Sequence, residues 1–181
     1  MSKVSETEII NGCQKGDQKS QRQLYDQYAP GLYAVCLRYA KNEQDAQDIL
    51  QESFIRIFKY MSSYQAKGSF EGWLKKIVVN VALKFYKRFY YSNENSELDP
   101  NISHLAIDTD VIDFISEKEL LSIIATLPEI LRFVFNLHVI EGYSHAEISQ
   151  ILSIEESTSR TYLLRARKKL IFKLEGLKTL Q

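Results

Sequence analysis

The side chains that most often carry catalysis or bind metals are few in this sequence and stand apart from one another. The three histidines, His104, His138 and His145, fall in an expected linker, a core helix and a helix start. Neither they nor Cys13 and Cys36 have the spacing of a metal site or of a nucleophile paired with a base. The sequence has no phosphate-binding loop and no dinucleotide-binding glycine motif. We therefore expect no catalytic residue, no metal and no cofactor.

A group of acidic residues recurs at helical spacing. Asp45, Asp48 and Glu52 share one face with Gln51 on a helix predicted over 43–61. Carboxylates at this spacing could serve acid–base chemistry, but no His, Ser or Cys stands ready to join them. Two interpretations remain: a solvated acidic surface, which the spacing alone favours, and a docking surface for a basic partner helix.

The stretch from 141 to 170 has the pattern of a helix-turn-helix. Ser144 and Glu147 form an S-x-x-E capping box that starts its first helix. Leu152-Ser153-Ile154 then has the apolar-small-apolar pattern of a corner where two helices cross closely. The second helix ends in the cationic run RARKKL. Taken alone, the stretch favours nucleic-acid binding over a solvated helix end whose Lys and Arg complement the helix dipole.

The second helix of this motif is expected to have two contrasting faces. One is a predicted buried stripe made of Ser159, Leu163, Ala166 and Leu170. The other presents the small and basic groups that suit a DNA groove, namely Thr158, Arg160, Thr161, Leu164, Arg165 and Lys168.

The composition indicates an all-α globular protein. The 181 residues include only three prolines and seven glycines, with many Leu, Ile, Lys, Glu and Gln. No apolar run could span a membrane, and the N-terminus MSKVSETEII lacks the apolar segment of a signal peptide. We expect a cytoplasmic protein without membrane insertion, with both cysteines reduced and packed as small hydrophobic residues.

Charge is distributed unevenly along a chain whose net charge is zero. Residues 1–91 carry a net charge of +5, residues 92–131 of −8, residues 132–156 of −3, and residues 157–181 of +6. Two basic ends around an acidic middle suggest two separate contacts with a polyanion.

Apolar periodicity predicts two small helical domains, 1–91 and 112–181, joined by an acidic flexible linker over 92–111. In the first domain we expect helices over 7–15, from 18 onward with an end or kink at Pro30, over 43–61, and from 70 onward. In the second we expect helices over 112–127 and 129–140 before the helix-turn-helix, with Leu131, Val134 and Phe135 in the core and His138 beside them.

The helix from 70 onward is basic, and a loop over 62–69 leads into it. Rings that stack on unpaired bases, next to ammonium groups that hold phosphates, are what single-stranded nucleic acid needs. Most aromatic side chains of this segment are expected in the core. Trp73, Ile77, Val81 and Phe85 share one face of the helix, and Phe70 and Phe89 are also expected to pack inside. Tyr64 is the ring that we expect to be exposed and free to stack.

With these motifs in this order, the chain closely resembles bacterial sigma factors of the extracytoplasmic-function (ECF) group. The resemblance covers nearly the whole chain and rests on LYDQYAPGLYAVCLRYAKNEQDAQDILQESFIRIF, GSFEGWLKKIVVNVAL and LPEILRFVFNLHVIEGYSHAEISQILSIEESTSRTYLLRARKKL. The second block and VIEGYSHAEI look like the Bacteroidetes-type members. Such a protein would be a transcription initiation factor that catalyses nothing itself.

The resemblance implies a role for each charged surface. Residues 1–91 would be sigma region 2 and residues 112–181 sigma region 4. The acidic face (Asp45, Asp48, Gln51 and Glu52) would dock on the clamp helices of the β′ subunit of core RNA polymerase. The melted −10 element would be held by Tyr64, Lys67, Lys75, Lys76, Asn80 and Lys84. The −35 element would be read as duplex by the second helix of the helix-turn-helix, with Arg160, Thr161, Leu164 and Arg165 nearest the bases.

Further partners follow from the same resemblance, together with some departures from it. The β flap of the polymerase and an anti-sigma factor are expected partners, and the linker would run toward the RNA exit path. Relatives usually carry glycine and a Ser cap where this chain has Ser153 and Glu155, and Ser157 replaces another common glycine. Ile130-Leu131 replaces a usual polar pair and indicates either a partner surface or core. Two alternatives remain: a sigma-like adaptor or decoy, and a stand-alone helix-turn-helix regulator.

Overall fold

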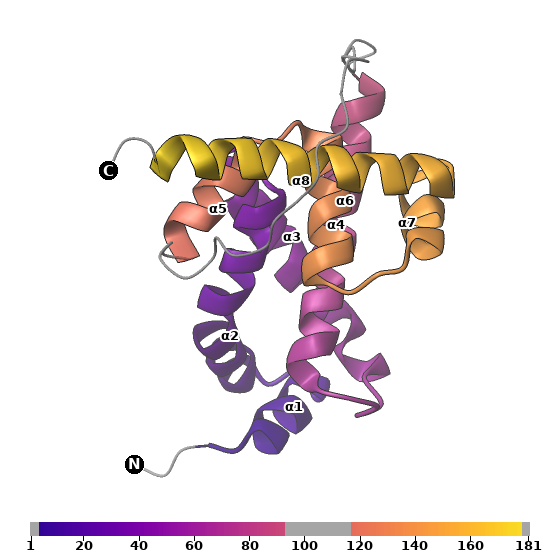
Figure 1. Cartoon of the computed structure of the whole chain (residues 1–181). Coiled ribbons are helices and arrows are strands. Elements are labelled where there is room, and N and C mark those ends of the chain that lie inside the picture. The colour runs from indigo at the N-terminus through magenta and orange to yellow at the C-terminus, as the bar shows by residue number, and fades with distance from the viewer. Residues whose placement is uncertain (1–3, 93–116, 179–181) are drawn as a thin grey trace. The chain divides into compact units, whose positions relative to one another are not determined.

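The computed structural model describes residues 4–92 and 117–178, and every regular element in these ranges is a helix (Figure 1). The chain divides into two compact units, 1–92 and 93–181. The all-α prediction is confirmed. The predicted linker, His104 and the predicted helix start over 112–116 lie outside the described residues, except that Ser92 ends a helix instead of opening the linker.

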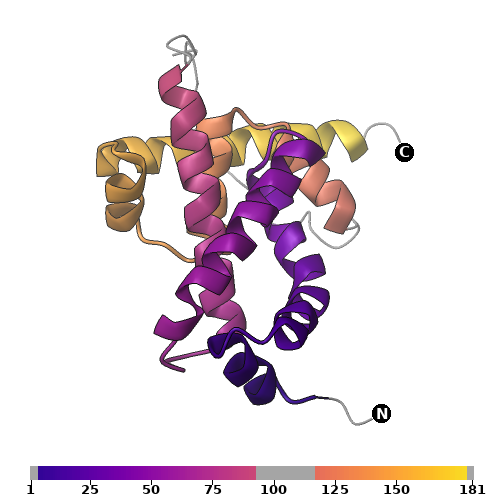
Figure 2. The same ribbon diagram turned by 180° about the vertical axis from the view of Figure 1, so that it is seen from behind.

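Four helices and a short 3-10 turn build the first unit. They are α1 (Glu6–Gln14), α2 (Gln18–Tyr39), α3 (Glu43–Tyr60), the turn η1 (Met61–Ser63) and α4 (Phe70–Ser92). Helices α2, α3 and α4 pack against one another, and α1 closes against α2 (Figure 2). Side-chain caps from Ser5, Asp17 and Asn42 start the first three helices.

Helix α2 runs through Pro30 without ending, contrary to one of the two outcomes expected there. Proline lacks an N–H and crowds the carbonyl four residues back, that of Asp26. Both Pro30 and Asp26 are on the exposed side of the helix, where water can bind the released carbonyl. The second half of the helix is fixed by buried Leu32, Val35, Cys36 and Tyr39.

The predicted buried face of α4 is wrong by part of a turn. Among Trp73, Ile77, Val81 and Phe85, only Val81 is buried, and the other three are half-buried. The deepest side chains on this helix are that of Phe70, which was expected inside, and those of Leu74, Val78, Val79 and Ala82, which were not predicted there. Helix α4 packs on both α2 and α3, so its buried surface is broad and a single stripe cannot describe it. The side chain of Phe89 lies outside the described part.

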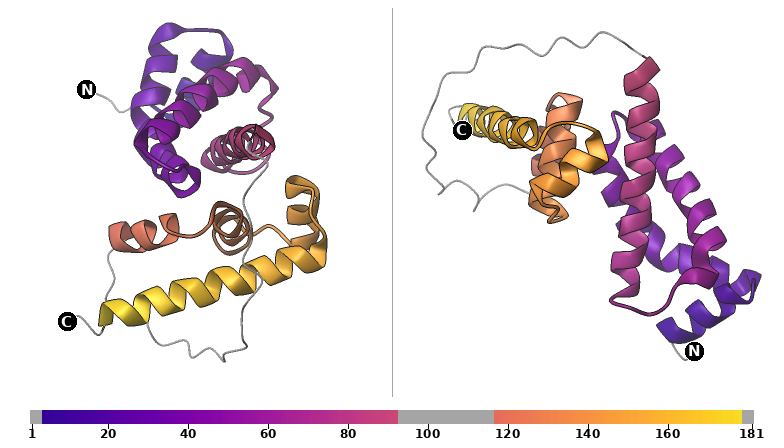
Figure 3. Two further views of the ribbon diagram at one scale, coloured as in Figure 1. Left: turned by 90° about the horizontal axis from the view of Figure 1, so that it is seen from above. Right: turned by 90° about the vertical axis from the view of Figure 1, so that its right-hand side faces the viewer.

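The second unit is built along its longest helix. Its elements are α5 (Glu117–Ala125), α6 (Glu129–Phe135), a π-helical turn η2 (Asn136–Ile140), α7 (His145–Leu152) and α8 (Glu156–Lys178). Figure 3 shows α8 running along α5 and α6, with α7 at its N-terminal end. Its core joins Ile123, Ile124, Leu127 and Leu131 to Ala166 and Leu170 of α8.

The structure of α6 decides whether Ile130 and Leu131 belong to the core and which later residues are buried. Leu131 is buried and Ile130 packs against the same cluster, so this pair belongs to the core. Leu131 and Val134 are buried as predicted, whereas Phe135 is half-buried and Leu137 lies deeper. The helix predicted over 129–140 turns π-helical after Phe135.

No helix in the described ranges is long and apolar enough to cross a membrane.

Candidate nucleic-acid and partner interface

The corner between α7 and α8 has the predicted geometry. Glu147 N–H donates to Ser144 Oγ at 3.2 Å, and Ser144 N–H donates to Glu147 Oε2 at 2.8 Å, which completes the capping box. Helix α7 ends at Ser153, whose backbone is left-handed with φ 57°. The N–H groups of Ser153 and Ile154 both donate to the Ser149 carbonyl. This conformation favours glycine, the residue that the resemblance to ECF sigma factors leads one to expect at this position.

Helix α8 has the two predicted faces. All four residues of the expected stripe, Ser159, Leu163, Ala166 and Leu170, are buried. On the opposite side Arg160, Thr161 and Leu164 are exposed, and Thr158, Arg165 and Lys168 are half-buried. A strip of basic and small side chains, three of them exposed and three half-buried, therefore lies away from the buried stripe of α8.

The exposed side chains at the start of α8 are partly engaged within the helix. Arg160 forms an ion pair with Glu156 one turn earlier, and the Arg160 side chain remains 63% exposed. Thr161 Oγ1 donates to the Ser157 carbonyl at 3.0 Å. An exposed pair at this spacing contributes only about 0.3–0.5 kcal/mol, so a phosphate or a base could displace it at little cost.

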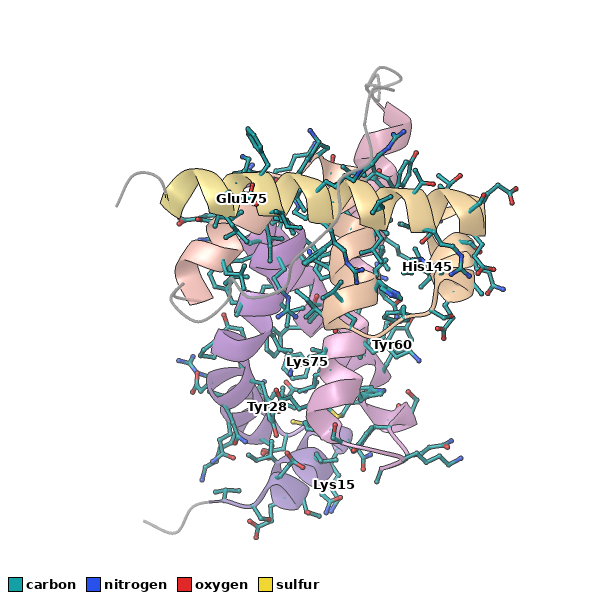
Figure 4. The ribbon with its side chains drawn as sticks, viewed as in Figure 1. Lys15, Tyr28, Tyr60, Lys75, His145 and Glu175 are labelled. Atoms are coloured by element: carbon teal, nitrogen blue, oxygen red, sulfur yellow. The ribbon has the colours of Figure 1, made fainter. Side chains whose placement is uncertain are left out.

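The rings of two histidines stack on each other beside buried Ser159 of α8, a contact that the sequence did not predict. The rings of His138 and His145 stack with centroids 4.3 Å apart and planes inclined by 16°. His145 is labelled in Figure 4. Its Nδ1 lies 2.9 Å from Oγ of buried Ser159, and His138 Nδ1 lies 2.8 Å from the Tyr143 carbonyl. His138 is thus satisfied and partly buried, as expected. The π-turn and the Gly142 bend bring the two rings together, and residue spacing does not predict either feature.

The expected exposed ring at Tyr64 is half-buried in the structure. Its ring centroid lies 5.0 Å from that of Phe70 and 5.1 Å from that of Trp73, and its hydroxyl donates to the Gly68 carbonyl at 3.3 Å. Gln14 of α1 donates to the carbonyls of Met61 and Tyr64, both at 3.4 Å. Tyr64 is therefore one edge of an aromatic cluster and not a free platform.

The polar residues predicted on α4 do not all behave alike. Lys76, Asn80 and Lys84 are exposed and recur every four residues, which places them in one line along the helix. Lys75 is half-buried and forms an ion pair with Glu71 at 2.8 Å. Lys67 is exposed in the preceding loop, between Ala66 and Gly68, whose φ angles are both positive.

The acidic face predicted on α3 lies on the surface of the first unit. Asp48 and Gln51 are exposed, and Asp45 and Glu52 are half-buried. Glu52 accepts from Arg56 Nε at 2.6 Å, and Asp48 accepts from Gln44 at 3.3 Å. The sequence reading missed Ile55, which is 56% exposed one turn after Gln51 and Glu52. The face therefore combines carboxylates with an apolar side chain.

The remaining reactive groups do not form a site in the described part of the chain. No cluster of three or more His, Cys, Asp or Glu there could hold a metal ion. Cys13 and Cys36 are buried free thiols, as predicted. Burial raises the pKa of Cys36 to about 12 and also raises that of Cys13.

Two models of the sigma-70 family match this chain: Sigma-70 region 2 over residues 24–89 and Sigma-70, region 4 over residues 117–170. The ECF RNA polymerase sigma-E factor of Haemophilus influenzae is 27% identical, over 96% of this chain and 97% of its own length. That of Salmonella typhimurium is 28% identical, over 93% of this chain and 94% of its own.

A solved relative agrees at the level of the fold. The sigma factor RpoE of Bartonella quintana, crystallised with the anti-sigma factor NepR, matches with a TM-score of 0.50 and 19% identity. The match covers 86% of this chain and 96% of that one. Each of the two family models falls within one unit of the structure, one on each side of residues 93–116. The chain therefore belongs to the sigma-70 family, as a sigma factor of the ECF group.

Proposed function

We propose that this protein binds core RNA polymerase and directs it to promoters, reading the −35 element as duplex and the −10 element as melted strand. The observation that carries the proposal is the two-faced helix α8, with a buried stripe on one side and basic side chains on the other. In this role the protein is an initiation factor and catalyses no reaction itself.

The −35 element is assigned to the exposed face of α8. Thr158, Arg160, Thr161, Leu164, Arg165 and Lys168 would enter or flank the major groove. Arginine can donate two hydrogen bonds to a guanine edge, and lysines along the same helix can hold phosphates. Without DNA, Glu156 forms an ion pair with the Arg160 side chain. On binding, DNA would replace Glu156 as the partner of Arg160.

The −10 element is assigned to the aromatic cluster and the adjoining face of α4. Tyr64, Phe70 and Trp73 form a set of rings at the start of that helix, and Tyr64 and Trp73 remain partly accessible. An unpaired base could stack on this edge, while Lys67, Lys75, Lys76, Asn80 and Lys84 hold the backbone of the strand. Because Lys76, Asn80 and Lys84 lie in a line along α4, the DNA strand would run along the axis of that helix.

Core polymerase is assigned to the acidic face of α3. Asp45, Asp48, Gln51 and Glu52 would meet the basic clamp helices of the β′ subunit, and Ile55 would pack at the centre of the contact. An apolar anchor surrounded by polar groups is the usual arrangement of strong binding sites between proteins. The β flap is a further expected contact of the second unit.

Three finer points belong to the same proposal. The relative from Bartonella quintana was crystallised with an anti-sigma factor, which supports an anti-sigma partner for this chain. The protein would act in the cytoplasm, where it meets the polymerase. The sequence features that look Bacteroidetes-like remain a prediction about its origin.

The proposal can be tested in a reconstituted transcription reaction in which the transcript start sites are mapped. Full-length protein is mixed with purified core polymerase and a library of genomic fragments from the source organism. We expect new start sites that share one −35 and one −10 element. Binding to core without any new start site would favour an adaptor or decoy. Tight, specific duplex binding without polymerase would favour a stand-alone regulator.

A further inference from the structure

The contact between His145 and Ser159 joins the two helices of the helix-turn-helix on their inner side. His145 is the first residue of α7, and Ser159 lies in the first turn of α8, fully buried between exposed Glu155 and Leu163 of the buried stripe. A buried hydroxyl in an apolar stripe requires a hydrogen-bond partner, and the imidazole Nδ1 provides one at 2.9 Å. This bond fixes how α8 is rotated about its own axis at the turn that carries Thr158, Arg160 and Thr161.

His138 holds the His145 ring from the other side. The two imidazoles are stacked, with centroids 4.3 Å apart, and His138 is itself tied to the Tyr143 carbonyl at 2.8 Å. The π-turn that carries His138 therefore supports the ring that supports α8. The chain of contacts runs from η2 through α7 to the recognition helix.

We propose that neutral His145 is a positioning residue for promoter reading, and that its protonation weakens recognition of the −35 element by placing a positive charge beside Arg160 and Arg167, which repels the start of α8. The proposal rests on the proposed function of α8. His145 itself touches no DNA in this scheme and acts through Ser159.

The surroundings of the ring disfavour a second positive charge there. His138 stacks on it from η2, and Arg160 and Arg167 act on it from α8, opposed by Glu156 alone on that helix. Burial first, then His138 and Arg160, lower the pKa of His145. A neutral ring is therefore the form that the folded second unit accommodates best.

The direction of the pH dependence follows from this environment. As the pH falls below about 6.5, a histidine in the unfolded chain binds a proton before His145 does in the folded state. The folded arrangement is thus at full stability above that pH and loses stability below it. Because one proton is involved, discrimination between promoters can fall by at most about tenfold per pH unit.

The test uses the full-length protein with core polymerase on a promoter found by start mapping. The measured quantity is the ratio of transcripts from that promoter to transcripts from a copy with a scrambled −35 element, followed from about pH 8 to about pH 6. Polymerase chemistry affects both templates equally, so it cancels in the ratio. We expect the wild-type ratio to be constant above about pH 6.5 and to fall below it.

Three variants separate positioning from general stability. In His145→Asn the side-chain amide nitrogen can occupy the place of Nδ1 without titrating, so the ratio should stay high and become independent of pH. His145→Ala and Ser159→Ala should each lower the ratio at every pH, and the double variant should be no worse than either single one. Circular dichroism at each pH verifies that the helices remain folded at the assay temperature.

Two results would overturn the inference. The first is a wild-type ratio with the same pH profile as His145→Asn, and the second is full −35 discrimination in folded His145→Ala. A wild-type protein that drives transcription but shows no −35 preference at any pH would overturn the assigned role of α8 and this inference with it. In that case, strictly additive losses of stability for His145→Ala and Ser159→Ala would separately show that the contact itself is not coupled.

Discussion

Single residues on α8 differ in what they can offer to DNA, although their types look alike in sequence. Arg160 and Arg167 are exposed and stand seven residues apart, on one side of the helix, whereas Arg165 is half-buried and lies on another side. Arg160 is also bound to Glu156 by an ion pair. Position around the helix, and not charge, therefore decides which arginine can reach a base.

Replacing Arg165 tests this distinction. Arg165→Ala should weaken binding to the −35 element by about 1–3 kcal/mol if the guanidinium makes a paired contact to a base. Lys173→Ala removes the same charge about two turns later, at an exposed residue outside the proposed −35 set, and is the matched control. The measurement is holoenzyme affinity for promoter fragments with each −35 base changed in turn. An unchanged base preference in Arg165→Ala would remove this residue from the readout.

Ser153 is a second residue whose effect can be predicted from its backbone alone. A non-glycine residue in the left-handed region costs roughly 1–2 kcal/mol, and glycine loses part of that gain through its more flexible unfolded chain. Ser153→Gly should therefore stabilise the second unit by up to about 1 kcal/mol in urea unfolding. Ser153→Ala keeps the strain and should not stabilise. A destabilised glycine variant would mean that the Ser153 side chain matters more than its backbone.

At the scale of whole elements, α3 combines two roles on opposite faces. Ala46, Ile49, Phe54 and Ile57 are buried, while the other side carries the carboxylates and Ile55. Charge on the outer face contributes little to folding, because a surface pair one turn apart, such as half-buried Glu52 with Arg56, is worth only about 0.3–0.5 kcal/mol. This face can therefore be altered with little damage to the fold.

Reversing the charge of that face should abolish binding to core polymerase. Asp48→Lys with Glu52→Lys places two ammonium groups opposite a basic partner, where like charges repel. Asp26→Lys with Glu43→Lys makes the same change in net charge elsewhere on the first unit and should retain binding. Co-purification with core polymerase measures both, and circular dichroism verifies the helices. Retained binding by the first variant would return the face to a plain solvated surface.

Local rules predicted some elements well and others poorly, and particular residues show why. The Ser144–Glu147 cap and the stripe from Ser159 to Leu170 were predictable because capping and helical periodicity act within a few residues. Tyr64 was placed wrongly because its partners Phe70 and Trp73 lie on the next helix. The buried face of α4 was missed because apolar residues occur on most of its sides. The His138–His145 stack depends on a π-turn that no short motif signals.

At the scale of the molecule, the chain consists of two units, each with its own core. In the first unit Leu24, Ile49, Ile57 and Leu74 are almost completely buried, and in the second Phe133, Val134, Leu137 and Ile148 are. The two sigma-70 models match these units separately. Residues 93–116 between them contain acidic residues and no Lys or Arg. We therefore expect each unit to fold by itself.

Expression of the first unit alone tests this independence. A fragment of residues 1–92 should be helical, should unfold cooperatively, and should bind core polymerase through α3. It should give no preference for a −35 sequence, because α8 is missing. Circular dichroism and co-purification are the measurements. A fragment that lacks helical structure would show that its core depends on the rest of the chain.

The burial of Cys13 and Cys36 has a practical consequence for such experiments. A thiolate is the species that reacts with maleimides, and a thiol with a raised pKa inside a core offers almost none of it. We expect the native protein to remain unlabelled while a cysteine introduced at exposed Lys67 or Lys76 reacts within minutes; mass spectrometry counts the adducts. Fluorophores or crosslinkers can therefore be attached to an introduced cysteine in the wild-type sequence, without first replacing Cys13 or Cys36.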